Sequence, residues 1–225
     1  MSFLGFLSGA VATVAGVFKG AVSLLGTVVP ALTATISPVL GLAAKALAGA
    51  SALAHTIAQF CGVTPPNVTQ EELGARAVQN SNLKPENFDS HCDFINALCA
   101  APFDRKAFEA STQEQKDAYR IAGFGIESVA VGEKLGIATN PQFYAACARA
   151  GIKDGAGGVQ LINSLKSNGI HDTSAFTEYV EHGDSELSVG LANASTEFSS
   201  NGGQDFNEMR SNVQSAMENE TKEVK

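Results

Sequence analysis

The sequence is short of several residue types, and each shortage excludes a class of protein. It has no Trp and only three Tyr, so it offers no aromatic platform for stacking sugars or bases. Its four Cys are too few to staple a chain of 225 residues with disulfides. Its 22 Gly follow no three-residue period, which excludes a collagen-like helix. Alternating runs of β-branched residues are scarce, which favours an all-α fold.

Sequence signatures of catalysis and of metal binding are also lacking. The chain has no C-x-x-C pair and no G-x-S-x-G, H-E-x-x-H or G-x-G-x-x-G motif. A nucleophile could in principle pair Cys92 or Cys147 with His171 or His182. Cysteines at apolar helical spacing are usually just buried, so we give this pairing little weight. We therefore expect no catalytic residue, no metal ion and no cofactor.

Charge is distributed very unevenly along the chain. Residues 1–62 carry only two charged side chains, Lys19 and Lys45, and no Asp or Glu. Residues 63–225 carry thirteen Lys or Arg against 23 Asp or Glu, a formal charge of −10. An acidic body has the wrong sign for a general nucleic-acid binder, so we expect no nucleic-acid partner. The sequence predicts an apolar head on a polar body.

The head contains a candidate membrane segment. Residues 20–44 form an uncharged run of 25 residues, and a helix of that length can cross a hydrocarbon core of about 30 Å. Pro30 and Pro38 interrupt this run, and an interior proline kinks or ends a helix. A helical hairpin fits better than a single span. We expect one helix over 2–29, a bend over 30–38 and a second helix over 39–61.

The first helix of this hairpin would have no polar face; its two faces would differ instead in the size of their side chains. Bulky side chains recur at steps of three and four, which places them on one face: Phe3, Leu7, Val11, Val14, Phe18, Val22, Leu25 and Val29. Small side chains recur every four residues on another face: Ser8, Ala12, Gly16 and Gly20. Such a ridge lets membrane helices approach closely. The alternative is a central helix buried in a soluble assembly.

The composition changes at Pro65 and Pro66, where a Pro-Pro pair favours an extended, semi-rigid spacer. We accordingly predict three parts: an apolar head over 1–62, a helical body over 63–200 and a polar tail over 201–225. Pro30, Pro38, Pro65 and Pro66 are the candidate hinges. An early basic region is missing, so we do not expect a cleaved signal peptide.

The body is predicted to be a series of short helices with recognisable starts and stops. The starts are the pairs Thr69/Glu72, Ser90/Asp93, Thr112/Gln115 and Asn140/Pro141, followed by a cap at Asp205. The predicted helices cover residues 70–80, 91–100, 113–135, 157–168, 174–182, 185–199 and 206–221. A further helix begins at residue 141 and is expected to stop at Gly151. The acidic pairs of the body are expected to be caps and solvated faces: Glu71 with Glu72, Glu127 with Glu133, and Asp184 with Glu186.

Two glycine-rich stretches and the tail leave alternatives open. In the longest helix, Gly123, Gly125 and Gly132 mark either close packing or a kink. Residues 155–158 are expected to be a flexible connector rather than an anion site, because no strand precedes them. The tail carries an apolar stripe that either docks or frays: Phe206, Met209, Val213 and Met217.

This organisation resembles, by analogy, proteins stored in soluble form that insert an apolar helical head into a membrane, such as phage ejection proteins and secreted pore-forming effectors. The resemblance implies a non-enzymatic, membrane-interacting protein that forms a channel or pore as an oligomer, delivered from a virion or an injection apparatus. Residues 1–62 would contact lipid or copies of the same chain. One alternative is a structural component of a large assembly, with the head buried between subunits. Another is an enzyme anchored by its head.

Overall fold

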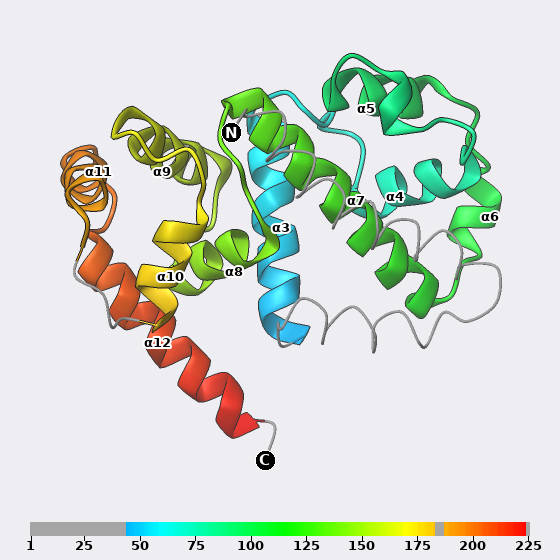
Figure 1. The fold of residues 1–225 in the computed structure, drawn as a ribbon. Helices are drawn as coiled ribbons and strands as arrows, with labels where there is room; N and C mark the ends of the chain where they lie inside the picture. Colours follow the sequence, from blue (N-terminus) through cyan, green and yellow to red (C-terminus); the bar gives the residue numbers. More distant parts are fainter. Residues whose placement is uncertain (1–43, 183–186, 224–225) are drawn as a thin grey trace.

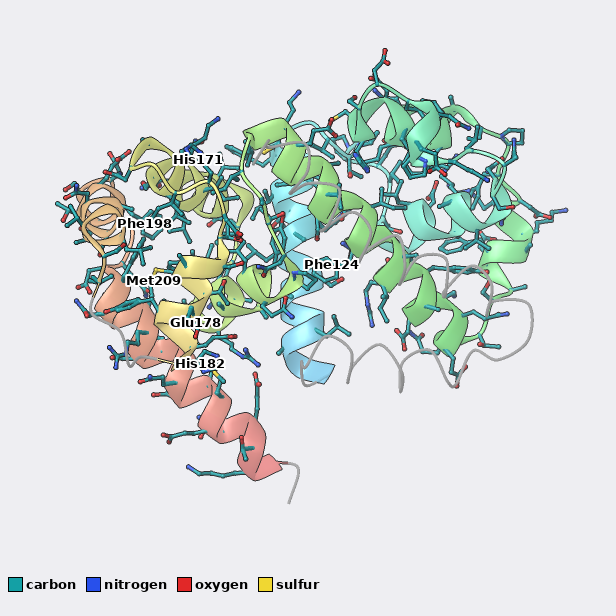
Figure 2. All side chains as sticks on the ribbon, viewed as in Figure 1. Phe124, His171, Glu178, His182, Phe198 and Met209 are labelled. Carbon is teal, nitrogen blue, oxygen red and sulfur yellow. The ribbon has the colours of Figure 1, made fainter. Side chains whose placement is uncertain are left out.

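The described part of the computed structural model, residues 44–182 and 187–223, is helical throughout (Figure 1). It contains ten α-helices and one 3₁₀ helix: α3 (Ala44–Phe60), α4 (Gln70–Gln79), η1 (Pro85–Asn87), α5 (His91–Ala100), α6 (Arg105–Glu109), α7 (Gln113–Leu135), α8 (Pro141–Ala150), α9 (Gly155–Ser167), α10 (Ser174–His182), α11 (Val189–Ser200) and α12 (Phe206–Glu223). Extended pairing in these ranges is limited to one isolated parallel bridge, between Ala138 and Asp172. The predicted all-α class is confirmed.

Local capping signals determine where the helices begin and end. Thr112 and Gln115 form a reciprocal capping box at the start of α7, and that helix ends at Gly136 with a φ of 69°. The predicted spans of α7 and α10 match the structure. The predicted side-chain caps Thr69, Ser90, Asn140 and Asp205 open four more helices, α4, α5, α8 and α12. Helix α6, capped by Asp104, was not predicted.

Helix α3 lies at the centre of the molecule (Figure 1). It packs against α7 on one side and against α8 and α9 on the other. Helices α4, α5 and α7 contact one another, and α8 and α10 contact α12 while α9 contacts α11. We call residues 63–135 the α4–α7 layer and residues 141–223 the α8–α12 layer. Each layer therefore has its own internal contacts, and α3 is the helix that both of them cover.

The position of α3 differs from the expectation for the apolar head. Residues 46–58 supply side chains to the same hydrophobic core as the helices that follow them. The part of the predicted head that the structure describes is thus packed as part of the body. Pro65 and Pro66 are not an extended spacer either, because the carbonyl of Pro65 accepts a hydrogen bond from the Val68 amide in a tight turn. The predicted helix over 2–29 and the bend over 30–38 lie outside the described residues.

Glycines make the closest helix contacts. A Cβ added at Gly74 would overlap the carbonyl oxygen of Tyr119, and one at Gly123 would overlap the carbonyl oxygen of Gln70. Gly123 therefore marks close packing of α7 on α4 rather than a kink. Gly155 and Gly158, expected in a flexible connector, instead form the first turn of α9, where added Cβ atoms would overlap α3. The missing side chains let the helix backbones approach each other.

The C-terminal helix α12 docks on the body. Phe206, Met209 and Val213 are fully buried against the core. Arg149 of α8 fixes the far end of the helix, because its guanidinium hydrogen-bonds both carboxylate oxygens of Glu220 and also Glu181 of α10. The docked alternative for the apolar stripe is confirmed.

The glycine contacts between α4 and α7 generate a stability prediction. Replacing Gly123 or Gly74 by Ala is expected to lower the free energy of unfolding by about 1–3 kcal/mol, because the methyl group forces the two backbones apart. Gly157 is the matched control, since an added Cβ there meets its nearest neighbour at 3.5 Å, an ordinary van der Waals contact. Gly157→Ala should be neutral or stabilising. Urea unfolding measures all three, and equal stabilities for Gly123→Ala and Gly157→Ala would contradict the close contact.

Candidate functional site

Most residues that the sequence nominated for membrane contact or self-association lie outside the described residues. They are Phe3, Leu7, Ser8, Val11, Ala12, Val14, Gly16, Phe18, Gly20, Val22, Leu25 and Val29, with the hinge residues Pro30 and Pro38. Pro65 and Pro66 are described, in the loop between α3 and α4. The chemically distinctive site in the described chain lies elsewhere, at the face of α3 that meets α7.

Glu127 of α7 is the centre of this site. Its side chain is fully buried, with a relative exposure of 0%, although the sequence placed it on a solvated face. A buried carboxylate is costly unless hydrogen bonds and an opposite charge compensate it. The prediction was wrong for Glu127, because this carboxylate is surrounded by partners that are distant in the sequence.

Three side chains donate hydrogen bonds to the Glu127 carboxylate. Thr64 Oγ1 and His55 Nδ1 each lie 2.7 Å from Oε1, and Gln70 Nε2 lies 2.6 Å from Oε2. The donors come from α3, from the loop after it and from the first turn of α4. Both oxygens are therefore satisfied, and one buried charge joins three separate segments of the chain.

Two hydrogen bonds with Ser51 fix the orientation of Gln70. The hydroxyl of Ser51, one helical turn before His55 on α3, donates to Gln70 Oε1. Gln70 Nε2 also donates to the backbone carbonyl of Ser51, at 3.3 Å. These contacts set the amide so that its nitrogen faces the carboxylate. We call Ser51, His55, Thr64, Gln70 and Glu127 the Glu127 cluster.

The electrostatics of His55 depend on its position beside the carboxylate. Burial of the imidazole lowers its pKa, whereas the hydrogen bond to Glu127 and the charges of Glu127 and Glu71 raise it. The raising effects together outweigh burial, so the pKa of His55 lies above its ordinary value of 6.5. The His55 side chain is 20% exposed, which leaves the proton exchangeable with solvent.

An imidazole oriented by a carboxylate is also the arrangement of a general base. Within the described ranges, however, no hydroxyl or thiol hydrogen-bonds to the His55 ring. Burial raises the thiol pKa of all four cysteines, which disfavours the reactive thiolate: Cys61, Cys92, Cys99 and Cys147. In the described residues no three His, Cys, Asp or Glu side chains gather as they would to hold a metal ion. The arrangement favours a structural and electrostatic role.

A second charged cluster is confined to the α4–α7 layer. The carboxylate of Glu72 accepts hydrogen bonds from Arg76 at 2.8 Å and from Arg105 at 3.3 Å. Arg76 also lies over the ring of Phe103, 4.4 Å from its centroid, and donates to the carbonyl of Cys99 at the end of α5. Because the Glu72 carboxylate binds these arginines, it does not hydrogen-bond back to Thr69, the residue that caps α4. This cluster holds α4, α5 and α6 together.

Part of the Glu127 cluster could have been found from the sequence. Glu127 lies three residues after Phe124 and four before Val131, and both of these are buried. A carboxylate on the apolar face of a helix indicates a buried polar contact. No sequence rule pairs it with His55, Thr64 or Gln70, which precede it by 72, 63 and 57 residues.

Comparison of the chain with protein-family models, with curated proteins and with solved structures finds no match in any of the three. None of the helices described in residues 44–182 and 187–223 combines the length and the apolar character that crossing a membrane needs.

Removing the buried carboxylate tests the energetic role of the cluster. Glu127→Leu leaves the Thr64 and Gln70 donors without an acceptor, and we expect a loss of about 3 kcal/mol in the free energy of unfolding. Glu133→Gln is the control, since its carboxylate is 35% exposed and pairs with His91. That change should cost less than about 1 kcal/mol. Urea unfolding at pH 6 compares them, and a Glu127→Leu loss no larger than the control would show that the cluster adds no stability.

Proposed function

We propose that the protein is a non-enzymatic, membrane-interacting helical protein that acts as an oligomer and forms a channel or pore. The setting we infer is delivery from a virion or an injection apparatus. The proposal rests on one observation: residues 1–43 contain a single charged side chain, Lys19, and no Asp or Glu. Such a composition is typical of segments that lie in lipid or in a protein interior.

The arrangement of the body narrows the proposal to fewer residues. Helix α3 is enclosed by α7, α8 and α9, so residues 44–60 are already used in the core. The membrane role is therefore assigned to residues 1–43 alone. The predicted helix over residues 2–29 would present its bulky face to lipid and its small-residue face to neighbouring copies of the chain. The acidic body would keep the protein soluble before insertion.

The second candidate function is a structural component of a large assembly, and α3 is the observation that favours it. This helix comes from the same Ala-rich stretch, in which Lys19 and Lys45 are the only charged side chains, and it is buried in protein: Ala50, Ala54 and Ile57 have no exposed surface. By analogy, residues 1–43 would be buried between subunits and would not meet lipid. A defined oligomer of the full chain in detergent-free sedimentation, with no vesicle binding, would favour this candidate.

Membrane insertion is tested on the full chain with phosphatidylcholine vesicles, since a truncation inside α3 would disrupt the core. We expect the chain to co-float with the vesicles and to release a trapped dye. Val14→Asp should reduce co-flotation more than tenfold, because an Asp at the centre of a bilayer costs about 2.5–3.5 kcal/mol. Val189→Asp is the matched control, since Val189 is 78% exposed on the body. Equal flotation of both variants, or no flotation of the unaltered chain, would overturn the membrane proposal.

Self-association through the small-residue face has its own test. Gly16→Ile places a branched side chain on that face and should sharply reduce cross-linking of the chain in vesicles, because the backbones can no longer approach. Ala10→Ile makes a similar increase in size away from the small-residue positions and should leave cross-linking unchanged. If both variants cross-link alike, the small residues are not the contact surface.

A further inference from the structure

We propose that the Glu127 cluster is a protonation-dependent lock: a positive charge on His55 holds the α4–α7 layer against α3, and loss of that charge lets this layer separate while α3 stays with the α8–α12 layer. The inference does not depend on the proposed function. It concerns how this fold opens, and it rests on the contrast between the two sides of α3.

The side of α3 that meets the α4–α7 layer combines apolar packing with a set of polar contacts. Ser51 and His55 face this layer, and with Thr64, Gln70 and Glu127 they form a continuous hydrogen-bonded set. Each of these bonds depends on the presence or orientation of one buried charge. A polar interface of this kind is strong while every group is paired and weak once the charge is uncompensated.

The opposite side of α3 is held by apolar packing. Leu53 and Ile57 are buried there, and Gly155 and Gly158 allow α9 to approach Ile57 and the backbone of α3. Contacts of this kind do not respond to a change in protonation, since dispersion and apolar burial carry no charge. A proton lost from the Glu127 cluster therefore weakens one side of α3 and leaves the other unchanged.

The charged groups that act on His55 come from α7 and α4. Glu127 faces it from α7, and Glu71 acts on it from α4. Arg120 lies 3.8 Å from Glu71 and partly offsets that charge. On α8, Tyr144 lies near Glu127, but its hydroxyl donates to Thr139 Oγ1 and its pKa is raised by burial, so it stays neutral. No described charged group of α9 contacts His55.

The direction of the pH effect follows from these groups. Because the pKa of His55 is higher in the folded protein than its ordinary value of 6.5, folding favours the protonated imidazole. The stabilisation is complete below about pH 6.5, where the unfolded chain is protonated as well. It is lost as the pH rises through the folded pKa. The lock is therefore closed at mildly acidic pH and loosens toward alkaline pH.

The test is hydrogen exchange of the full chain at pH 6.0 and pH 8.5, read by mass spectrometry and corrected for intrinsic exchange rates. We expect amides of α4 and α7 to exchange several-fold faster at pH 8.5, with α8, α9 and α12 unchanged. An equal acceleration in α8–α12 would mean global unfolding and would overturn the selective lock. No acceleration in α4 and α7 would overturn the lock itself.

His55→Asn removes the titration and keeps an amide nitrogen near the position of Nδ1. This variant should lose the pH difference in α4 and α7, whereas the exposed His171→Asn control should keep it. Persistence of the difference in His55→Asn would overturn the assignment to His55.

If His55→Asn fails to fold, an NMR titration of the imidazoles in the unaltered chain decides instead. A His55 midpoint above 6.5 supports the lock, and one at or below 6.5 overturns it. Neither readout involves lipid, so failure of vesicle binding leaves this inference standing.

Discussion

The burial of helix α3 on both sides is the constraint on which the rest of the structure depends. Neither layer covers it alone, since α7 takes one side while α8 and α9 take the other. The two layers have few other contacts, and between them the chain passes through the short link of residues 136–140. That link pairs back on residues 171–173, where the Ala138 amide donates to the carbonyl of His171. Without α3, the two layers would lose the surface that makes them one body.

Helix α3 packs against its neighbours in two different ways, by close backbone contact on one side and by hydrogen bonds to a buried carboxylate on the other. Against α9, glycines allow backbone contact and many small dispersion gains. Against α7, a buried carboxylate is compensated by donors from three segments. Apolar packing of small residues tolerates small rotations of a helix, whereas hydrogen bonds to one carboxylate do not. The polar side therefore defines the geometry, and the apolar side contributes contact area.

Local signals made much of the fold predictable. The ends of α7 and α8 follow from caps and glycines within a few residues of them, and such contacts can be predicted from the sequence. The five residues of α6 are too few to show a period. The place of α3 was not predictable, because an Ala-rich helix with a single Lys has the same sequence pattern whether it lies in lipid or in a protein core. The Glu127 cluster was missed for a related reason, since its bonds join residues distant in the sequence.

The polar cluster also explains how so uniform a helix keeps one orientation. Between Ala46 and Ala58 most side chains of α3 are small, so apolar burial alone would favour several rotations about the helix axis almost equally. Ser51 and His55 are four residues apart and lie on one face, where Gln70 and Glu127 receive them. Any other rotation would take the His55 hydrogen bond away from the buried Glu127 carboxylate. A single buried charge therefore selects the rotation of α3, much as one buried polar residue fixes the register of a coiled coil.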